Sequence, residues 1–431
     1  MFNTKMLKKY QNNLRNLLVK NGHYLFLLVL AGFFIYLRYY HIQFEGNTGY
    51  DQARDAFAAR DVVKGKFPLQ GPWTGNGHLH IGPLYYYLLG FFFYIFNLDP
   101  IASNYLNIIF NIFNFFAIYF ILSKLTTKRA ALFGILVFTF SKEYILAGRT
   151  AWNVSPMIGL GALIFYGIIQ IYKGHFHWFY VVAVFAGLYF HAHFTAIFLP
   201  VIILLSLFFL KNKKTALKYI VFSIPLYLMW FVPNILSEIL HQNSDGYRYR
   251  EFVQYFYHGF HLRFFFYRLP YHFILFNKIF SIGNNFFQLA IPLVYLFYVL
   301  IFEKNKQEKL IGYIIFMFFL VPILGFTVYA GPISEYYYNH AVITVFYVLI
   351  YLQKRLLQIN YKVLLTVLAI FWLVNFYVGT KDLWIKKSTG GLQGTKEGTR
   401  AEILQGKKIP FDIGHMDSYL YTIWKEDTKR Y

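Results

Sequence analysis

Three aspartates follow the first long apolar segment, in a chain with only 19 acidic residues among 431. They are Asp51, Asp55 and Asp61, within GNTGYDQARDAFAARD at residues 46–61. A carboxylate at a membrane surface can act as a general base on an attacking hydroxyl or amine, or it can hold a divalent cation. Asp51 and Asp55 share one face if residues 50–65 form a helix. Asp51 is therefore the first candidate for catalysis, with Asp55 supporting it; the alternative is that both cap a helix or stay solvated.

Two pairs of histidines also fall beside apolar runs. His78 and His80 lie in GPWTGNGHLHIGPLYYYLLG, at residues 71–90. Imidazoles and backbone amides near the start of a helix suit a phosphate group. His191 and His193 lie in a tight turn between two apolar runs, where ionisable residues are functional candidates. For each pair the alternative is a hydrogen-bonded histidine without a ligand.

A short polar segment, SKEYILAGRTAWNVSP at residues 141–156, contains Arg149 in otherwise apolar surroundings. The fork of an arginine can bind two phosphate oxygens, so this residue is a candidate phosphate clamp. The alternative is an arginine that extends towards the lipid headgroups. Trp152 and Asn153 stand just before the Ser-Pro that opens the next apolar run, and they are candidate acceptor contacts.

Two later segments add candidates. The loop at residues 237–285 alternates aromatic and basic residues around Arg248, which favours a membrane-lying lid over the substrate. A surface-seeking amphipathic helix without substrate contact explains the same pattern. In AGPISEYYYNH, Glu335 can bond a sugar hydroxyl or cap the following helix.

The apolar segments between these residues must position them. The chain is 58% hydrophobic and 14% charged, whereas a soluble domain carries about a quarter charged residues. Runs of about twenty apolar residues recur, each long enough to cross a bilayer. We therefore predict an all-α polytopic membrane protein with about eleven spans. The predicted spans are 23–40, 101–123, 130–147, 155–172, 178–191, 194–210, 217–236, 286–303, 309–330, 336–352 and 362–379.

Basic residues set the orientation. The N-terminus and the connections SKLTTKRA, KNKKTALK, FEKNKQEK and QKRLLQINYK are basic, and all fall on one side if residues 83–97 do not span. The predicted N-terminus is then cytoplasmic and the predicted C-terminus outside. We expect a transmembrane domain at residues 1–379 and a small extracytoplasmic tail at residues 380–431. The predicted outside segments of the first domain are 41–100, 148–154, 237–285 and 331–335, with amphipathic helices in the first of them.

The net charge of +22 does not indicate nucleic-acid binding, because Lys and Arg gather in short loops between apolar runs. The sequence has no cysteine, which excludes disulfides and thiolate chemistry. It also matches no phosphate-binding loop or dinucleotide fingerprint, which disfavours a sugar-nucleotide donor.

The order of these features resembles the GT-C glycosyltransferases of the protein O-mannosyltransferase and aminoarabinose-transferase type. One apolar span precedes a loop with an early aspartate, then H-x-G-P-L-Y-Y-Y-L-L from His80, a hairpin of spans with a basic turn, and R-x-x-W-N-x-S-P from Arg149. The resemblance covers residues 23–210, and the remainder only in architecture. It implies the GT-C fold and the transfer of a sugar from a polyprenyl-phosphate carrier to an acceptor on the outer face.

Two of the family's acids are amides in this chain. The family's Asp-Glu pair corresponds to Asp51-Gln52, and the acid of its second loop corresponds to Asn153. This difference puts the acceptor and metal dependence in question. The resemblance, taken with the residues above, gives one set of expected roles: catalysis by Asp51; donor phosphate binding by His80, Arg149, His78 and His193; acceptor binding or support by Gln52, Asp55, Trp152, Asn153, Arg248 and Glu335.

We therefore expect an inverting glycosyltransferase in a plasma (inner) membrane, with Asp51 as general base. Inversion needs one base on the acceptor and cations on the departing phosphate. The expected partners are a polyprenyl-phosphate-linked sugar, a protein, lipid or glycan acceptor, and membrane lipids, without nucleic acid. A divalent cation (Mg or Mn) at Asp51 stays open, because the sequence has no compact ligand cluster.

Two alternatives remain at this point. A polyprenyl-linked glycan polymerase or ligase would carry its arginines and a histidine in a large late outside loop, which residues 237–285 resemble. A lipid or solute transporter would show broken helices and charges near mid-membrane, often with internal repeats. We see no internal repeat in the sequence.

Overall fold

The computed structural model describes residues 4–44, 48–73, 79–240, 253–254, 262–277, 285–329, 331, 333–357 and 391–427, with six isolated positions between 366 and 381. Within these residues the structure is helical, and its only extended pairing is a single antiparallel bridge between Trp73 and His80. The prediction of an all-α chain is confirmed.

Among the described residues, the first half of the chain contains ten α-helices, α1 to α10. They are α1 (Thr4–Tyr39), α2 (Tyr50–Val63), α3 (Leu84–Ile95), α4 (Ala102–Leu125), α5 (Lys128–Phe140), α6 (Lys142–Arg149), α7 (Met157–Tyr172), α8 (Trp178–Phe190), α9 (Phe198–Ser206) and α10 (Lys213–Leu228). The second half adds α11 (Val232–Leu240), α13 (Leu262–Asn277), α14 (Asn285–Ile301), α15 (Lys306–Thr327), α16 (Val342–Leu357), α18 (Gly391–Leu404) and α19 (Met416–Asp427). Short 3₁₀ turns are η1 (Ile42–Phe44), η2 (Phe194–Ile197), η3 (Met229–Phe231) and η5 (Glu335–Ala341).

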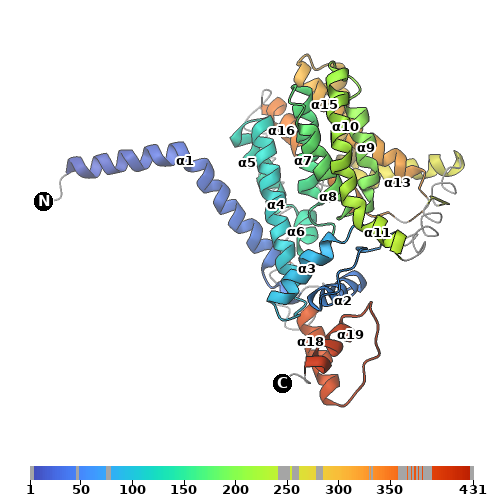
Figure 1. Ribbon diagram of the computed structural model, residues 1–431. Coiled ribbons are helices and arrows are strands. Elements are labelled where there is room, and N and C mark those ends of the chain that lie inside the picture. The colour runs from blue at the N-terminus through green and yellow to red at the C-terminus, as the bar shows by residue number, and fades with distance from the viewer. Residues whose placement is uncertain are drawn as a thin grey trace.

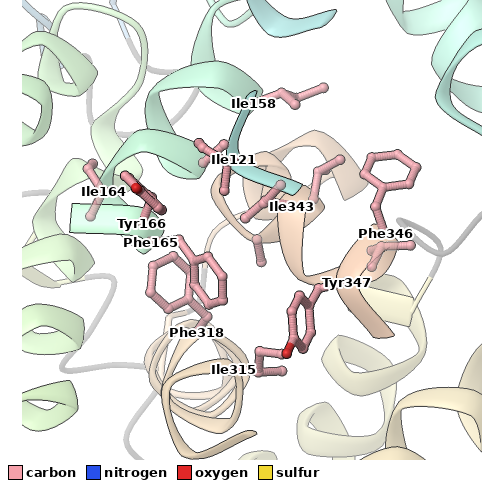
Figure 2. Close-up of a cluster of buried hydrophobic side chains, with 14 of the residues drawn as sticks. Ile121, Ile158, Ile164, Phe165, Tyr166, Ile315, Phe318, Ile343, Phe346 and Tyr347 are labelled. Atoms are coloured by element: carbon pink, nitrogen blue, oxygen red, sulfur yellow. The ribbon is translucent and has the colours of Figure 1, made fainter. Parts of the chain in front are cut away.

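The upright helices form one bundle around α7 (Figure 1). Almost every residue of α7 is buried, which fits a helix that is apolar all round. In Figure 2 side chains from α4, α7, α15 and α16 point into the same space, with Phe165 edge-on to Phe318 at 5.4 Å between ring centroids. Four helical segments of the described chain are long and apolar enough to cross a membrane. They are Gly22–Phe44, Ala102–Leu125, Lys213–Leu240 and Lys306–Thr327, joined by shorter apolar helices.

The predicted span at residues 130–147 is broken in the structure. α5 ends at Phe140, Ser141 is extended, and α6 leaves at an angle of 63°. The buried Arg38 stabilises the break: its guanidinium donates to the carbonyls of Phe138 (2.9 Å) and Tyr144 (3.1 Å). The carbonyl of Phe138 lies in the last turn of α5, where carbonyls lack an intrahelical partner, and the arginine satisfies it. An average of hydropathy over the segment does not reveal this bend.

A second, smaller core lies at one end of the bundle and joins α2, α3 and α19 (Figure 1). α3 has only 12 residues, which is about 18 Å of helix. Its buried residues belong to this second core and not to the core of the bundle. This placement agrees with the interpretation that residues 83–97 do not span. The predicted span at 362–379 lies almost wholly outside the described residues.

The chain beyond residue 390 forms a helical hairpin, α18 and α19, that packs under α2 (Figure 1). Tyr419 is fully buried, with its ring 5.2 Å from that of Phe57 and 6.1 Å from that of Phe93. Lys396 forms an ion pair with Asp99, at the turn between α3 and α4. The hairpin and α2 therefore lie at the same end of the bundle.

Candidate active site

An ion-pair cluster occupies the start of α2. Arg54 donates from Nη1 to Asp51 Oδ1 at 2.8 Å. The same guanidinium donates from Nε (2.9 Å) and Nη2 (2.7 Å) to Asp55 Oδ1. Asp51 lies three residues before Arg54 and four before Asp55, so the two carboxylates share one face of the helix with the arginine near both. Asp55 is buried, whereas the side chain of Asp51 is 40% exposed and is the carboxylate that a substrate can reach.

Burial sets the charge balance of this cluster. Removal from water raises the pKa of the Asp55 carboxyl to about 6, although the Arg54 guanidinium acts against that rise. The neighbouring carboxylates raise the pKa of Arg54, so the arginine stays charged. Arg54 therefore pairs with two carboxylates, Asp51 and Asp55, and its single positive charge does not balance both.

The two amides that correspond to family acids act as hydrogen-bond donors. Gln52 Nε2 donates to the carbonyl of Ala151 at 3.2 Å, which ties α2 to the segment after α6. Asn153 Nδ2 donates to the carbonyl of Ala192 at 2.6 Å, which ties that segment to the turn between α8 and α9. An ionised carboxylate has no hydrogen to donate. The two amides thus connect α2, the segment after α6 and the turn between α8 and α9 by hydrogen bonds that ionised acids at these positions could not donate.

These ties enclose a cavity of about 410 Å³, the Asp51 cavity. Its wall brings together four residues that the sequence singled out. The four are Asp51, Trp152, Asn153 and His193. Two further residues, Arg54 and Tyr336, also line the cavity and were not predicted. Arg54 had a signal in the sequence, because it stands between two aspartates in a chain poor in acids.

His193 contributes a neutral ring to this cavity. It is buried, and burial lowers the pKa of its imidazole to about 3, with a smaller effect from His340. Its Nδ1 accepts from the backbone N–H of Thr195 at 3.4 Å, capping η2. The neutral ring therefore carries its proton on Nε2 and offers a hydrogen-bond donor without charge. Its predicted role towards the donor phosphate stays a prediction.

His80 lines a different cavity of about 470 Å³, the His80 cavity, on the other side of Arg54. Arg54 and Trp73 line both cavities. The backbone around His80 is held from two sides: Asn234 Nδ2 donates to its carbonyl at 3.0 Å, and Leu84 N–H donates to His191 Nδ1 at 3.1 Å.

A glycine makes the second of these contacts possible. A Cβ on Gly82 would lie 2.1 Å from the ring of His191, closer than side chains approach one another. His191 therefore packs directly on the loop that carries His80. The sequence indicated His191 as a functional candidate, but it did not predict this contact with the His80 loop.

Arg149 lies away from these cavities, at the end of α1. Its Nη1 donates to the carbonyl of Leu37 at 2.9 Å and its Nη2 to that of Tyr40 at 2.8 Å. These are the last carbonyls of the helix, so the arginine acts as a C-terminal cap. The predicted phosphate clamp stays a prediction, and these contacts give Arg149 a structural role in aligning α1 with α6.

The remaining predicted residues separate into two groups. Glu335 lines a cavity next to the Asp51 cavity, which shares Trp152 and Tyr336 with it. His78 and Arg248 lie outside the described residues, as does most of the loop at 237–285. Their predicted roles in donor binding and substrate support remain predictions.

The aspartates of α2 do not fit a metal site. A divalent cation prefers several carboxylate oxygens around it. The position between Asp51 and Asp55 is occupied by the guanidinium of Arg54. Across the described ranges, no three acidic or histidine residues gather as a metal-binding group. We therefore assign no step to a metal.

Comparison with known proteins supports the fold. Residues 80–236 match the model of a family described as dolichyl-phosphate-mannose-protein mannosyltransferase. The chain is also similar to ArnT from Cupriavidus metallidurans bound to undecaprenyl phosphate, with a TM-score of 0.52 and 13% identity. That match covers 75% of this chain and 58% of ArnT. Comparison with curated proteins gives no match.

The oligosaccharyltransferase of Archaeoglobus fulgidus, tethered to an acceptor peptide with an NVT sequon, gives a TM-score of 0.55 and 14% identity. It aligns with 94% of this chain, which spans 59% of that protein. The chain thus covers less than two thirds of either solved structure. The predicted resemblance is confirmed: the chain is a polytopic membrane protein with the GT-C glycosyltransferase fold.

Proposed function

We propose that this GT-C-fold chain is an inverting glycosyltransferase that moves a sugar from a polyprenyl-phosphate carrier to an acceptor, with Asp51 as general base. The observation that carries the proposal is the Asp51 cavity. It places a half-exposed carboxylate beside a buried cation and an uncharged hydrogen-bond donor, His193. The undecaprenyl phosphate bound to ArnT, a protein with the same fold, supports a polyprenyl-linked donor.

The proposed reaction is a single displacement. The acceptor oxygen or nitrogen attacks the anomeric carbon of the donor sugar from the side opposite the phosphate. The bond between that carbon and the phosphate oxygen breaks, and polyprenyl phosphate leaves with the electron pair. Asp51 takes the proton of the attacking group, so no covalent enzyme intermediate forms and the anomeric configuration inverts.

Arg54 and His193 have matching roles. Negative charge grows on the departing phosphate, and a fixed cation in a site of low dielectric stabilises it. Arg54 lines both the Asp51 and His80 cavities and is the cation nearest to the base. The neutral His193 ring can donate a hydrogen bond to the sugar or to the phosphate. It does not compete with Asp51 for the proton of the attacking group. The site is expected to face the extracytoplasmic side of a plasma (inner) membrane.

The test compares wild-type protein with Asp51→Asn in nanodiscs, using a panel of radiolabelled polyprenyl-phosphate sugars. Loss of a general base lowers the transfer rate by about 10²- to 10⁴-fold. Glu397→Gln is the matched control, because Glu397 is an exposed carboxylate on α18, away from the cavities. Undiminished transfer by a folded Asp51→Asn protein would refute the assignment.

One observation keeps a second candidate in view. Transporters place their sites at broken helices near the membrane midplane, and α5 and α6 form such a break. A transporter would move a lipid-linked sugar across vesicles without cleaving it. Intact carrier recovered on the far side, with no release of polyprenyl phosphate, would favour this reading over transfer.

A further inference from the structure

A second cavity of about 530 Å³ lies beside the Asp51 cavity, between α4, α6 and η5. The break after α5 forms one wall, because α6 turns away at Ser141 and carries Glu143 to the cavity. Glu335 and Asn339, from η5, form the opposite wall. We call this space the Glu335 cavity. Its volume is that of an ordinary small-molecule site.

The shape of the Glu335 cavity is fixed by two buried asparagines of α4. Asn114 Nδ2 donates to the carbonyl of Ser155 at 2.7 Å, and its Oδ1 accepts from Gly159 N–H at 2.8 Å. Asn111 Nδ2 donates to the carbonyl of Gly148 at 3.0 Å. These hydrogen bonds connect α4 to the segments on either side of the cavity. The amide atoms that form them are already occupied by protein partners.

The charged groups that remain for a ligand are two carboxylates, beside the amide of Asn339. The side chains of Glu143, Glu335 and Asn339 make no hydrogen bond or ion pair within the part of the chain that the structure describes. Ionised carboxylates only accept hydrogen bonds. None of the described residues that line this cavity is a lysine, arginine or histidine. A phosphate group would meet two negative charges here without a cation, so the donor headgroup does not fit.

An aromatic wall separates the two cavities. The rings of Trp152 and Tyr336 lie 4.9 Å apart between centroids, and both residues line both cavities. The Glu335 cavity and the Asp51 cavity therefore adjoin at this aromatic pair. Carboxylate acceptors beside an aromatic ring suit a sugar, whose hydroxyls donate and whose C–H face packs on the ring.

We propose that the Glu335 cavity is the acceptor subsite and that it holds a neutral or amino sugar, whose attacking hydroxyl passes Tyr336 to reach Asp51. This inference rests on the proposed function, because it names the acceptor class of the same reaction. A peptide fits less well, because its backbone has as many carbonyl acceptors as N–H donors. Those carbonyls would face the carboxylates of Glu143 and Glu335, which are acceptors too. A glycan acceptor offers several hydroxyl donors.

The first experiment needs no turnover. The chain has no cysteine, so Asn339→Cys is the single thiol of its variant. The rate of alkylation of this thiol is measured with glucosamine, mannose, inorganic phosphate or the tripeptide Gly-Ser-Gly present at tens of millimolar. We expect either sugar to slow alkylation several-fold, and phosphate and peptide to have no effect. Gln405→Cys, on the exposed end of the C-terminal hairpin, is the control that no probe protects.

Protection by phosphate or by the tripeptide as strongly as by sugar, or protection by no probe, would overturn the proposal. A second experiment measures Glu335→Gln in the transfer assay. Loss of a charged hydrogen bond is expected to raise the acceptor KM by about 10- to 100-fold. An unchanged acceptor KM would also overturn it. Thiol protection without transfer by wild type would refute the proposed reaction and leave the sugar site standing.

Discussion

The Asp51 cavity and the Glu335 cavity share an aromatic wall and differ in charge. The first is lined by Arg54, by the neutral His193 and by one accessible carboxylate. The second is lined by two exposed carboxylates and by amides, with no cation among its described residues. A phosphate is stabilised by the first environment and repelled by the second, whereas a polyhydroxyl compound can bind in either.

This difference teaches how one membrane domain can keep two substrates apart. In the proposed reaction the donor carries a charge and the acceptor need not, so the charges that line the two cavities would favour the donor in the first and the acceptor in the second. The aromatic pair of Trp152 and Tyr336 then leaves the reacting groups as neighbours. Four variants or treatments test this comparison, and the largest effect is expected at Arg54.

Replacement of Arg54 by methionine removes the cation from the Asp51 cavity. We expect transfer to fall at least about 100-fold, as electrostatic stabilisation of the leaving group is lost. We also expect the free energy of unfolding to fall by about 3–5 kcal/mol, because Asp55 becomes a buried charge without a partner. Transfer assays and thermal midpoints in detergent measure the two effects.

The double variant Arg54→Met/Asp55→Asn separates them. It removes the buried charge together with its partner, so the thermal midpoint should recover while transfer stays low. Recovery of transfer in the double variant would show that Arg54 acts only on stability. The charge difference between the two cavities would then have no part in catalysis.

Replacement of Trp152 by alanine opens the wall between the cavities. Water should then compete with the acceptor at Asp51, and we expect the ratio of free to transferred sugar to rise about tenfold, or about 1.4 kcal/mol. Both products are counted from one radiolabelled donor. Trp424→Ala, in α19, is the control. An unchanged ratio would mean that this ring does not partition the two spaces.

His193→Asn tests the neutral state of the histidine. Asparagine keeps a capping oxygen for Thr195, but it does not titrate. The folded protein lowers the pKa of His193 from 6.5 to about 3, so between these values the unfolded chain binds more protons. His193 therefore costs wild type stability as pH falls below about 6.5, by at most about 1.4 kcal/mol per pH unit. The thermal midpoint of the variant should fall less between pH 7 and pH 5.

The exposed His415 provides the matched control for that experiment, because its side chain is 67% exposed. His415→Asn should leave the acid dependence of the midpoint as in wild type. If His193→Asn and wild type lose stability in parallel, the imidazole of His193 has the same pKa in the folded and the unfolded chain. The ring would then gain a positive charge in the Asp51 cavity only as pH falls through that value.

A chelator should have the smallest effect. Arg54 occupies the place between the α2 carboxylates, so we expect EDTA to leave the transfer rate unchanged. The measurement is transfer after dialysis against EDTA, with and without added Mg²⁺ or Mn²⁺. Loss of transfer that a metal restores would show that a cation binds at the site when substrate is present.

The sequence predicted much of this site because type and spacing carried the signal. Asp51, Asn153 and His193 stand beside span ends, and the order of the loops placed them together in one cavity. The family resemblance was confirmed for the fold. Glu335 was predicted to contact a sugar, and it lines the adjoining cavity, where its role stays a proposal.

Other features depend on distances that a sequence does not contain. Arg54 is not among the predicted residues, because its spacing from two aspartates does not show that its side chain is buried between them. The sequence does not show that Arg149 donates to carbonyls at the end of α1, and its predicted role as a phosphate ligand stays a prediction. The bend at Ser141 was invisible because the residues on both sides are apolar enough for one span.

The hairpin of α18 and α19 makes the packing of α2 depend on the order in which the chain is translated. Tyr419, which closes the core over Phe57 and Phe93, is translated long after α2. Until α19 is made, one apolar face of α2 has no cover. A product that stops before α18 would contain the described residues that line the Asp51 cavity and would lack the packing that supports α2.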